Sequence, residues 1–189
     1  MIRIGIIGDI GSGKTFVANK FGYPVFNADL EVDKIYKTDR NCFRKLNKIF
    51  PKYIESFPVS KKNITKIILK NNFNLNKIIK IIHPLVRKKM SKFLIRNKKK
   101  KLIILDVPLL LENKINKKGD VLVFVDSKKK KILKRLHRRK NFDVKLLYKF
   151  KKIQLPIEYK KKKSQFIIRN NFNNKFLKRD INKILEKIL

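Results

Sequence analysis

Short runs of consecutive apolar residues recur along the chain, separated by stretches in which apolar residues recur with helical spacing. The runs predict strands at residues 2–7, 23–27, 102–106, 121–126 and 166–168. An unbroken apolar run is typical of a strand buried on both faces of a parallel sheet. Short strands that alternate with helices favour a parallel sheet with helices on both of its faces. We therefore expect an α/β fold whose five-stranded sheet is the middle of three layers.

The longest helical stretch runs from about residue 30 to residue 97, between the second and third expected strands. Its apolar residues, such as Leu75 and Ile78, recur every three or four positions. The pair His83-Pro84 interrupts this pattern. The residue before a proline avoids helical dihedral angles, and proline suits a first helical turn. We therefore expect one helix to end at this pair and another to begin.

Shorter helices are expected at four other places. One follows the first strand at residues 15–21 and ends before Gly22. Ser127 and Asp143 precede two further helical patterns, and both are residue types that cap helix N-termini. The last helix covers about residues 177–188, where apolar residues fall on one side.

The composition allows one sizeable hydrophobic core. A chain of 189 residues with 43% apolar residues is most economically a single domain, residues 1–189, with insertions. Its one cysteine, Cys42, excludes an internal disulfide framework. The sequence has neither an apolar leader nor an apolar run of membrane length. We expect a cytoplasmic protein that does not associate with membranes.

The net charge is strongly positive, with 51 Lys and Arg against 14 Asp and Glu and a net of +37. Such a charge by itself suggests a nucleic-acid-binding protein. The lysines, however, are spread through nearly every polar segment and accompany many Ile and Asn residues, as the coding bias of an AT-rich genome would produce. Phe and Tyr are scattered among apolar positions, so no stacking surface is evident. We expect no specific nucleic-acid partner, and any RNA binding should weaken with salt.

The sequence GDIGSGKT, which begins at Gly8 and ends at Thr15, directly follows the first apolar run. The pattern G-x-x-x-x-G-K-[ST] between a strand and a helix predicts a phosphate-binding loop and hence a P-loop NTPase-type fold. Its glycines let backbone N–H groups surround phosphate oxygens, Lys14 reaches the terminal phosphates, and Thr15 offers a hydroxyl to Mg²⁺. The residues expected to contact ATP are Gly8, Gly11, Ser12, Gly13, Lys14, Thr15 and Phe16. The alternative is a glycine-rich turn without a ligand.

Three classes of protein with such a loop compete. A GTPase switch usually carries Asn-Lys-x-Asp, which is absent here, and a motor ATPase generally needs a longer chain. A small-molecule kinase needs an acceptor-binding insertion, a carboxylate near the acceptor hydroxyl, and mobile arginines over the phosphates. Asp29 is a candidate for the carboxylate, and Arg135 and Arg139 are candidates for the arginines. The expected division is a core at 1–29, 101–127 and 164–189, an acceptor insertion at about 30–100, and a lid at about 128–163.

Several motifs in order resemble the dephospho-coenzyme A kinase family over nearly the whole chain. After the phosphate loop they are Asn27-Ala28-Asp29, His83-Pro84, DVPLLLE from Asp106 to Glu112, RLHRR from Arg135 to Arg139, Gln154, Ser164-Gln165 and Asn170. Each motif alone is weak, but their order and spacing together are specific. The long helical insertion suits a bulky acceptor rather than a small one such as shikimate.

The resemblance implies transfer of the ATP γ-phosphate to the ribose 3′-hydroxyl of dephospho-coenzyme A. Asp29 would orient this hydroxyl and accept its proton, while Lys14 and Mg²⁺ neutralise phosphate charge. Asp106 ends a buried strand, where phosphate-loop enzymes often keep a carboxylate for Mg²⁺, so Thr15 and Asp106 are the expected metal ligands. Arg139 is the expected lid arginine.

Alternatives remain for individual residues. Asp29 could be a helix N-cap before Leu30, and His83 could contact the acceptor or only interrupt a helix. Arg135 and Arg138 could both be solvated, and Glu112 is expected to be structural. Shikimate-type or nucleoside-type kinases are the runner-up activity, followed by an ATP-dependent nucleic-acid-binding protein. A monomer or weak homo-oligomer is expected.

The chain departs from the family pattern at five positions. Asn27 replaces an Asp, Asp9 stands where Gly is usual, and Phe16 replaces a small hydroxyl residue. Gln165 replaces an Asp, and Phe172 replaces the usual Gly after the Asn pair. Asp9 should weaken ATP binding by repulsion unless its carboxylate points away from the phosphates. Gln165 and Phe172 put contacts on the adenine side in question. None of these changes affects Lys14, Thr15 or Asp29.

Overall fold

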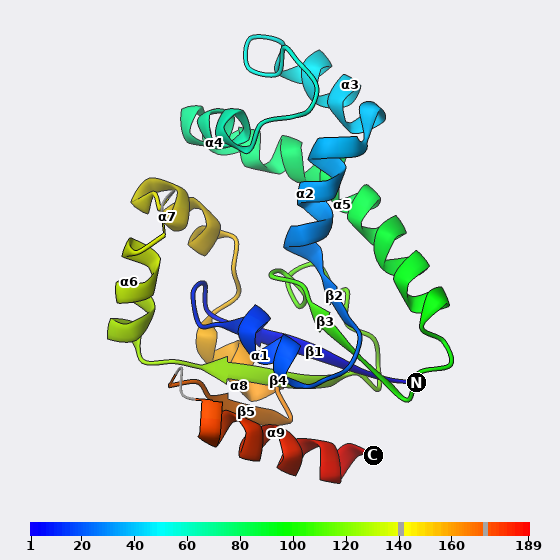
Figure 1. Ribbon diagram of the computed structural model, residues 1–189. Coiled ribbons are helices and arrows are strands. Elements are labelled where there is room, and N and C mark those ends of the chain that lie inside the picture. The colour runs from blue at the N-terminus through cyan, green and yellow to red at the C-terminus, as the bar shows by residue number, and fades with distance from the viewer. Residues whose placement is uncertain (140–141, 172–173) are drawn as a thin grey trace. The chain divides into compact units, whose positions relative to one another are not determined.

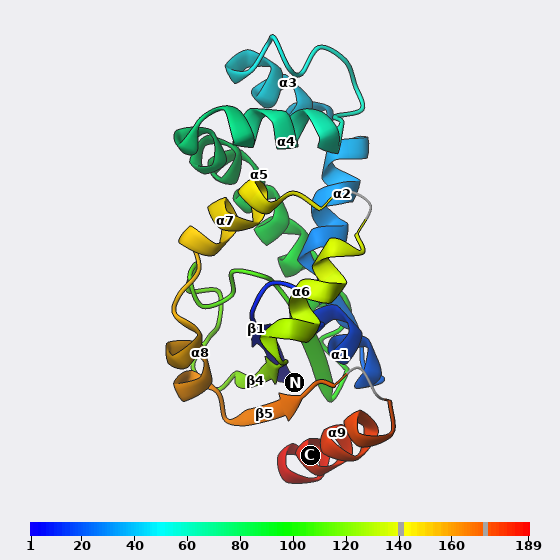
Figure 2. The same cartoon turned by 90° about the vertical axis from the view of Figure 1, so that its left-hand side faces the viewer.

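The computed structural model describes residues 1–139, 142–171 and 174–189 and divides them into two compact units. The sheet unit comprises residues 1–27, 97–143 and 151–189, and the helical unit comprises residues 28–96 and 144–150. Figure 1 shows the elements of both units, and Figure 2 shows them turned by 90°. Residues 140 and 141 of the expected lid lie outside the described residues, and so does Phe172, one of the departures from the family pattern.

The sheet unit contains the expected parallel sheet. Its strands are β1 (Ile2–Gly8), β2 (Val25–Asn27), β3 (Leu102–Asp106), β4 (Val121–Asp126) and β5 (Phe166–Arg169). Their order is β2-β3-β1-β4-β5, and every neighbouring pair is parallel. Strand β2 begins later than expected, because Pro24 has no N–H to donate to the ladder and contributes only its carbonyl, which accepts from Ile104.

Helices cover both faces of this sheet. On one face, α1 (Lys14–Lys20) and α9 (Asn174–Ile188) pack on a buried cluster that includes Ile4, Ile6, Val123 and Val125. Side chains alternate along a strand, so Phe124 belongs to the opposite face. There Lys161 of α8 (Ile157–Lys163) lies 5.7 Å from the centroid of the Phe124 ring. The three-layer α/β expectation is confirmed (Figure 2).

The close packing of Leu110 on this opposite face explains why residue 5 is a glycine. A Cβ atom on Gly5 of β1 would lie 2.5 Å from Leu110 Cδ2, and Leu110 is fully buried. The segment after β3 therefore lies directly against the backbone of the central strand. Any side chain at Gly5 would displace Leu110 from the core.

The helical unit contains α2 (Ala28–Thr38), α3 (Arg40–Ile49), α4 (Lys61–Lys70), α5 (Asn72–Arg96) and the first seven residues of α7 (Val144–Lys152). The predicted helix break at His83-Pro84 is wrong, because α5 continues through Pro84. A proline inside a helix removes one backbone hydrogen bond and crowds the preceding turn. Burial of Ile78 and Ile82 on the same helix offsets part of that cost.

Helix α7 is fixed to α4 within the helical unit. The Lys149 ammonium donates to the carbonyls of Ile68 at 2.7 Å and of Leu69 at 3.2 Å. These carbonyls belong to the last turn of α4, where a positive side chain is favourable. Part of the expected lid region is therefore attached to the expected acceptor insertion.

The other part of the expected lid belongs to the sheet unit. Helix α6 (Lys129–His137) begins after Lys128, so the prediction that Ser127 is its N-cap is wrong. The Ser127 hydroxyl instead bonds to backbone carbonyls near the phosphate loop. Helix α7 begins directly after Asp143, whose capping role stays a prediction, as does the single-domain organisation. Among the helices in the described ranges, none has the length and apolarity to cross a membrane.

Candidate active site

The phosphate loop connects β1 to α1 in the sheet unit. Gly11 and Gly13 have φ angles of 84° and 92°, in the left-handed region that favours glycine. A Cβ atom on Gly11 would also lie 3.0 Å from side-chain carbons of Ile132 and Leu136 in α6. The loop thus needs glycine both for its dihedral angles and for its contact with α6.

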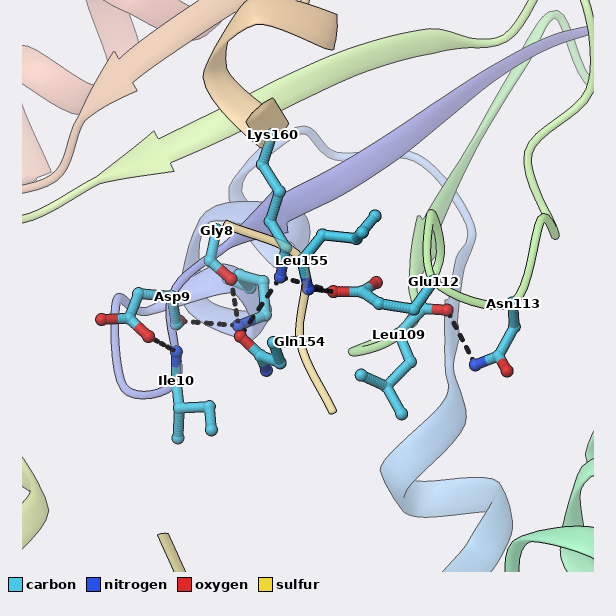
Figure 3. A network of polar contacts seen from close by, with 10 residues as sticks. Gly8, Asp9, Ile10, Leu109, Glu112, Asn113, Gln154, Leu155 and Lys160 are labelled. Atoms are coloured by element: carbon cyan, nitrogen blue, oxygen red, sulfur yellow. Dashed lines mark hydrogen bonds and ion pairs between the residues drawn. The ribbon is translucent and has the colours of Figure 1, made fainter. Parts of the chain in front are cut away.

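Lys14 folds back over the loop that precedes it. Its ammonium donates to the Asp9 carbonyl at 2.8 Å and to the Gly8 carbonyl at 3.3 Å. The Asp9 carboxylate accepts from the Ile10 N–H at 2.7 Å, and Figure 3 shows this local bond. One oxygen of the Asp9 carboxylate is therefore hydrogen-bonded to the backbone. The effect of Asp9 on ATP binding stays a prediction.

Thr15 and Asp106, the two expected metal ligands, are in contact. Asp106 Oδ2 accepts from Thr15 Oγ1 at 2.6 Å and from Asn27 Nδ2 at 2.6 Å. Asp106 is buried, with 3% of its surface exposed. The Asn27 amide donates at a position where a second carboxylate would repel Asp106. A hydroxyl and a carboxylate oxygen side by side fit a hard cation such as Mg²⁺.

Residues that follow β4 and β5 form hydrogen bonds to the backbone of the phosphate loop. Ser127 Oγ and Asn170 Nδ2 each lie 2.9 Å from the carbonyl oxygen of Ser12. Ser12 and Asn170 are buried. The family pattern pointed to Asn170, but neither its contact nor that of Ser127 was foreseen, because the partner is a backbone carbonyl distant in sequence.

Arg135, rather than Arg139, contacts the loop. Its guanidinium donates to the Gly11 carbonyl at 3.5 Å. Partial burial, followed by the nearby charge of Arg139, lowers the pKa of Arg135. Arg138 and Arg139 are exposed at the end of α6. Helical spacing could have indicated Arg135, since it lies one turn after Ile132, whose side chain meets the loop.

A buried ion pair lies between the segment after β3 and the region after α7. Lys160 Nζ lies 2.7 Å from Glu112 Oε1 and 3.1 Å from Gln154 Oε1. Figure 3 shows these contacts as dashed lines. Glu112 Oε1 also accepts from the Leu155 N–H at 3.1 Å. The side chains of Lys160 and Glu112 are 2% and 10% exposed. Glu112 is thus held in a buried ion pair, and its structural role stays a prediction. Lys160 was missed because it stands in a run of lysines.

Comparison with known proteins identifies the family to which the chain belongs. A family model described as dephospho-CoA kinase matches residues 2–175. The chain belongs to the dephospho-CoA kinase family. Over 129 residues it is 39% identical to the dephospho-CoA kinase of Bartonella henselae, covering 66% of this chain and 66% of that protein. The aligned part of the chain therefore spans just under two thirds of that relative.

Two solved structures resemble the chain over nearly its whole length. One is a Thermus thermophilus protein, with 24% identity and a TM-score of 0.80 over 100% of this chain and 98% of that chain. The other is a dephospho-CoA kinase from Campylobacter jejuni, with 23% identity and a TM-score of 0.64 over 98% and 96%. At these identities the likeness concerns the fold, and it confirms the expected α/β architecture.

Two motif residues of the dephospho-CoA kinase pattern lie in the helical unit. Asp29 is exposed and is the second residue of α2, so the alternative that it is the N-cap is wrong. His83 lies within α5 and is partly buried. Desolvation by burial, followed by the charge of Arg87, lowers the pKa of His83. His83 is therefore held in its neutral form at neutral pH.

Two departures from the dephospho-CoA kinase pattern have local explanations. Gln165 Oε1 accepts from the Leu122 N–H at 2.7 Å, and the Gln165 N–H donates to the Leu122 carbonyl at 3.0 Å. This pairing lies where β4 and β5 begin, at the sheet edge away from the phosphate loop. Phe16 packs against the core cluster below α1, so it can offer a nucleotide only its backbone N–H.

Proposed function

We propose that the chain transfers the γ-phosphate of ATP to the ribose 3′-hydroxyl of dephospho-coenzyme A, the last step of coenzyme A biosynthesis. The observation that carries this proposal is the contact of Thr15 with Asp106 beside a phosphate loop, in a chain of the dephospho-CoA kinase family. Membership of the family supports the choice of acceptor, and the residues of the site support the phosphate chemistry.

Binding of ATP begins with the loop backbone. Gly8, Gly11, Ser12, Gly13, Lys14, Thr15 and Phe16 are proposed to present N–H groups or side chains to the phosphates. The Lys14 ammonium exchanges its bonds to the carbonyls of Gly8 and Asp9 for phosphate oxygens. The exchange is favourable because the ammonium then lies beside phosphate oxygens that carry negative charge instead of neutral carbonyl oxygens.

The Mg²⁺ ion is proposed to bind at the Thr15 hydroxyl and the Asp106 carboxylate, where the hard oxygen donors suit it. When bound there with ATP, it supplies positive charge that neutralises the β- and γ-phosphates. Asn27 keeps Asp106 oriented by donating to the same oxygen that Thr15 contacts.

Proton removal from the acceptor is assigned to Asp29. It follows Asn27 by two residues, and its carboxylate is exposed at the first turn of α2. A carboxylate that accepts a hydrogen bond from the acceptor hydroxyl orients the attacking oxygen. Arg135 and Arg139 are proposed to stabilise the charge on the transferred group, Arg135 from its place beside Gly11.

Acceptor-dependent turnover tests this proposal. Release of ADP from Mg-ATP is measured with dephospho-coenzyme A, with shikimate and with deoxynucleosides, and the product is identified by mass. Turnover with dephospho-coenzyme A that Asp29→Asn reduces about a hundredfold or more supports both reaction and role. Asp33→Asn, one turn later on α2, is the matched control and should keep its activity. Turnover with another acceptor alone refutes the proposal.

The remaining expectations concern the setting of the enzyme. We place it in the cytoplasm as a monomer or weak homo-oligomer, without a specific nucleic-acid partner. Sedimentation velocity over a range of concentrations measures the oligomeric state. Binding to RNA that persists at high salt would contradict the absence of a specific nucleic-acid partner.

A further inference from the structure

Residues that follow three different strands meet at the carbonyl of Ser12. Ser12 follows β1 in the phosphate loop, Ser127 follows β4, and Asn170 follows β5. Ser127 Oγ and Asn170 Nδ2 both reach Ser12 O at 2.9 Å. The backbone N–H of Asn170 donates to the Asp126 carbonyl at 2.7 Å. The residue whose side-chain amide reaches Ser12 is therefore itself fixed to β4.

The side chain of Ser12 does not determine this orientation. Within the part of the chain that the structure describes, Ser12 Oγ is buried and has no hydrogen-bond partner. The Ser12 N–H donates to the Asp9 carbonyl at 3.2 Å, which closes the turn before it. The peptide after Ser12 is therefore oriented through its carbonyl, by Ser127 and Asn170.

A trans peptide is planar, and its C=O and N–H bonds point in opposite directions. The carbonyl of Ser12 and the N–H of Gly13 belong to the same peptide. Because Ser127 and Asn170 hold the carbonyl, the Gly13 N–H must point away from them. A donor that is already oriented when the ligand arrives needs no reorganisation to meet the ligand's charge.

We propose that Ser127 and Asn170 are positioning residues of the phosphate site. By holding the carbonyl of Ser12, they direct the Gly13 N–H toward the phosphates of the bound nucleotide. Neither residue contacts the nucleotide in this role. The inference rests on the proposed function only in that the loop must bind a nucleotide, and it does not depend on the acceptor.

Three variants separate this role from general stability. Asn170→Asp keeps the shape of the side chain but replaces the donating amide by a carboxylate oxygen, which repels the Ser12 carbonyl. We expect it to weaken Mg-ADP binding about tenfold or more. Ser127→Ala removes one of the two donors and should weaken binding about threefold to tenfold. Asn171→Ala, at the next and exposed position, is the matched control and should bind Mg-ADP normally.

The dissociation constant of Mg-ADP is measured by calorimetry, and the Gly13 N–H is observed by NMR. The chain has six glycines, so ¹⁵N-glycine labelling gives few signals, and Gly13→Ala assigns the one of interest. In the unmodified chain, Mg-ADP should shift the Gly13 amide proton downfield as it bonds to phosphate. Asn170→Asp should lose most of that shift, while a purely structural residue would leave it unchanged in the folded fraction.

The outcomes are distinct. Weaker binding with a lost Gly13 shift supports the proposal, and if Asn170→Asp does not fold, the same readouts on Ser127→Ala decide. Normal binding, or weaker binding with an unchanged Gly13 shift, overturns it. If the unmodified chain binds Mg-ADP but does not phosphorylate dephospho-coenzyme A, the proposed function fails and this inference is still judged by the Gly13 signal. Absence of Mg-ADP binding by the unmodified chain overturns both.

Discussion

Removal of Lys160 should strongly destabilise the protein. Its side chain is 2% exposed, and its ammonium lies 2.7 Å from Glu112, whose side chain is 10% exposed. Lys160→Met keeps the length of the side chain but leaves the Glu112 carboxylate buried without its cation. Breaking a buried ion pair from one side costs about 3–5 kcal/mol, because the remaining charge is uncompensated. We expect a loss of that size in the free energy of unfolding.

The structure also predicts that a second substitution restores part of this loss. In the double variant Glu112→Gln/Lys160→Met, neither charge of the pair remains buried. The amide oxygen introduced by Glu112→Gln can still accept from the Leu155 N–H, as the Glu112 carboxylate does at 3.1 Å. The double variant should therefore be more stable than Lys160→Met by about 1–3 kcal/mol. A double-mutant cycle with Glu112→Gln alone gives the coupling energy between the two side chains.

Urea unfolding at pH 7, followed by far-ultraviolet circular dichroism, measures these differences. Lys161→Met is the control on the same helix, since the Lys161 side chain is 30% exposed and its ion pairs are long, at 3.8 and 3.9 Å. It should cost less than about 1 kcal/mol. If the free energy of unfolding of Lys160→Met lies within about 1 kcal/mol of that of the unmodified chain, the assignment of an uncompensated buried charge is refuted.

Three further predictions concern the metal, pH and salt. Asp106→Asn should raise the Mg²⁺ concentration needed for half-maximal activity about tenfold or more, since a carboxylate is lost beside Thr15; an unchanged Mg²⁺ titration would remove Asp106 from the metal site. His83 has a lowered pKa, so the unfolded chain binds the proton more readily. Its contribution to stability is complete above the unfolded value of about 6.5 and is lost as the pH falls below it, so His83→Gln should flatten the decline of the melting temperature between about pH 6.5 and 5. The melting temperature should rise with added salt because of the +37 charge, and independence of ionic strength would contradict this.

The strands and the phosphate loop could be predicted because their signals are local. Unbroken apolar runs marked the strands, and the left-handed glycines of the loop are encoded in the motif itself. The continuation of α5 through Pro84 could not be predicted from local preference, since burial of Ile78 and Ile82 overrides it.

Long-range polar contacts were the other limit of prediction. Asn170 and Ser127 meet Ser12 across 158 and 115 residues of sequence, and their shared partner is a backbone atom that no residue type marks. Lys160 could not be distinguished from neighbouring lysines, because only the three-dimensional burial of its ammonium separates it from them. Arg135 was named as a candidate, but its contact with Gly11 depends on how α6 packs.

The attachment of α7 to α4 bears on how the helical unit could be exchanged between relatives. The helical unit is built from two separate pieces of the chain, residues 28–96 and 144–150. A chimera that grafts only the first piece would place Lys149 opposite a foreign helix end, and its two bonds would form only if that helix ends at the same place as α4. Recombination that respects the physical unit must carry both pieces together, although 47 residues of the sheet unit, 97–143, separate them in the gene.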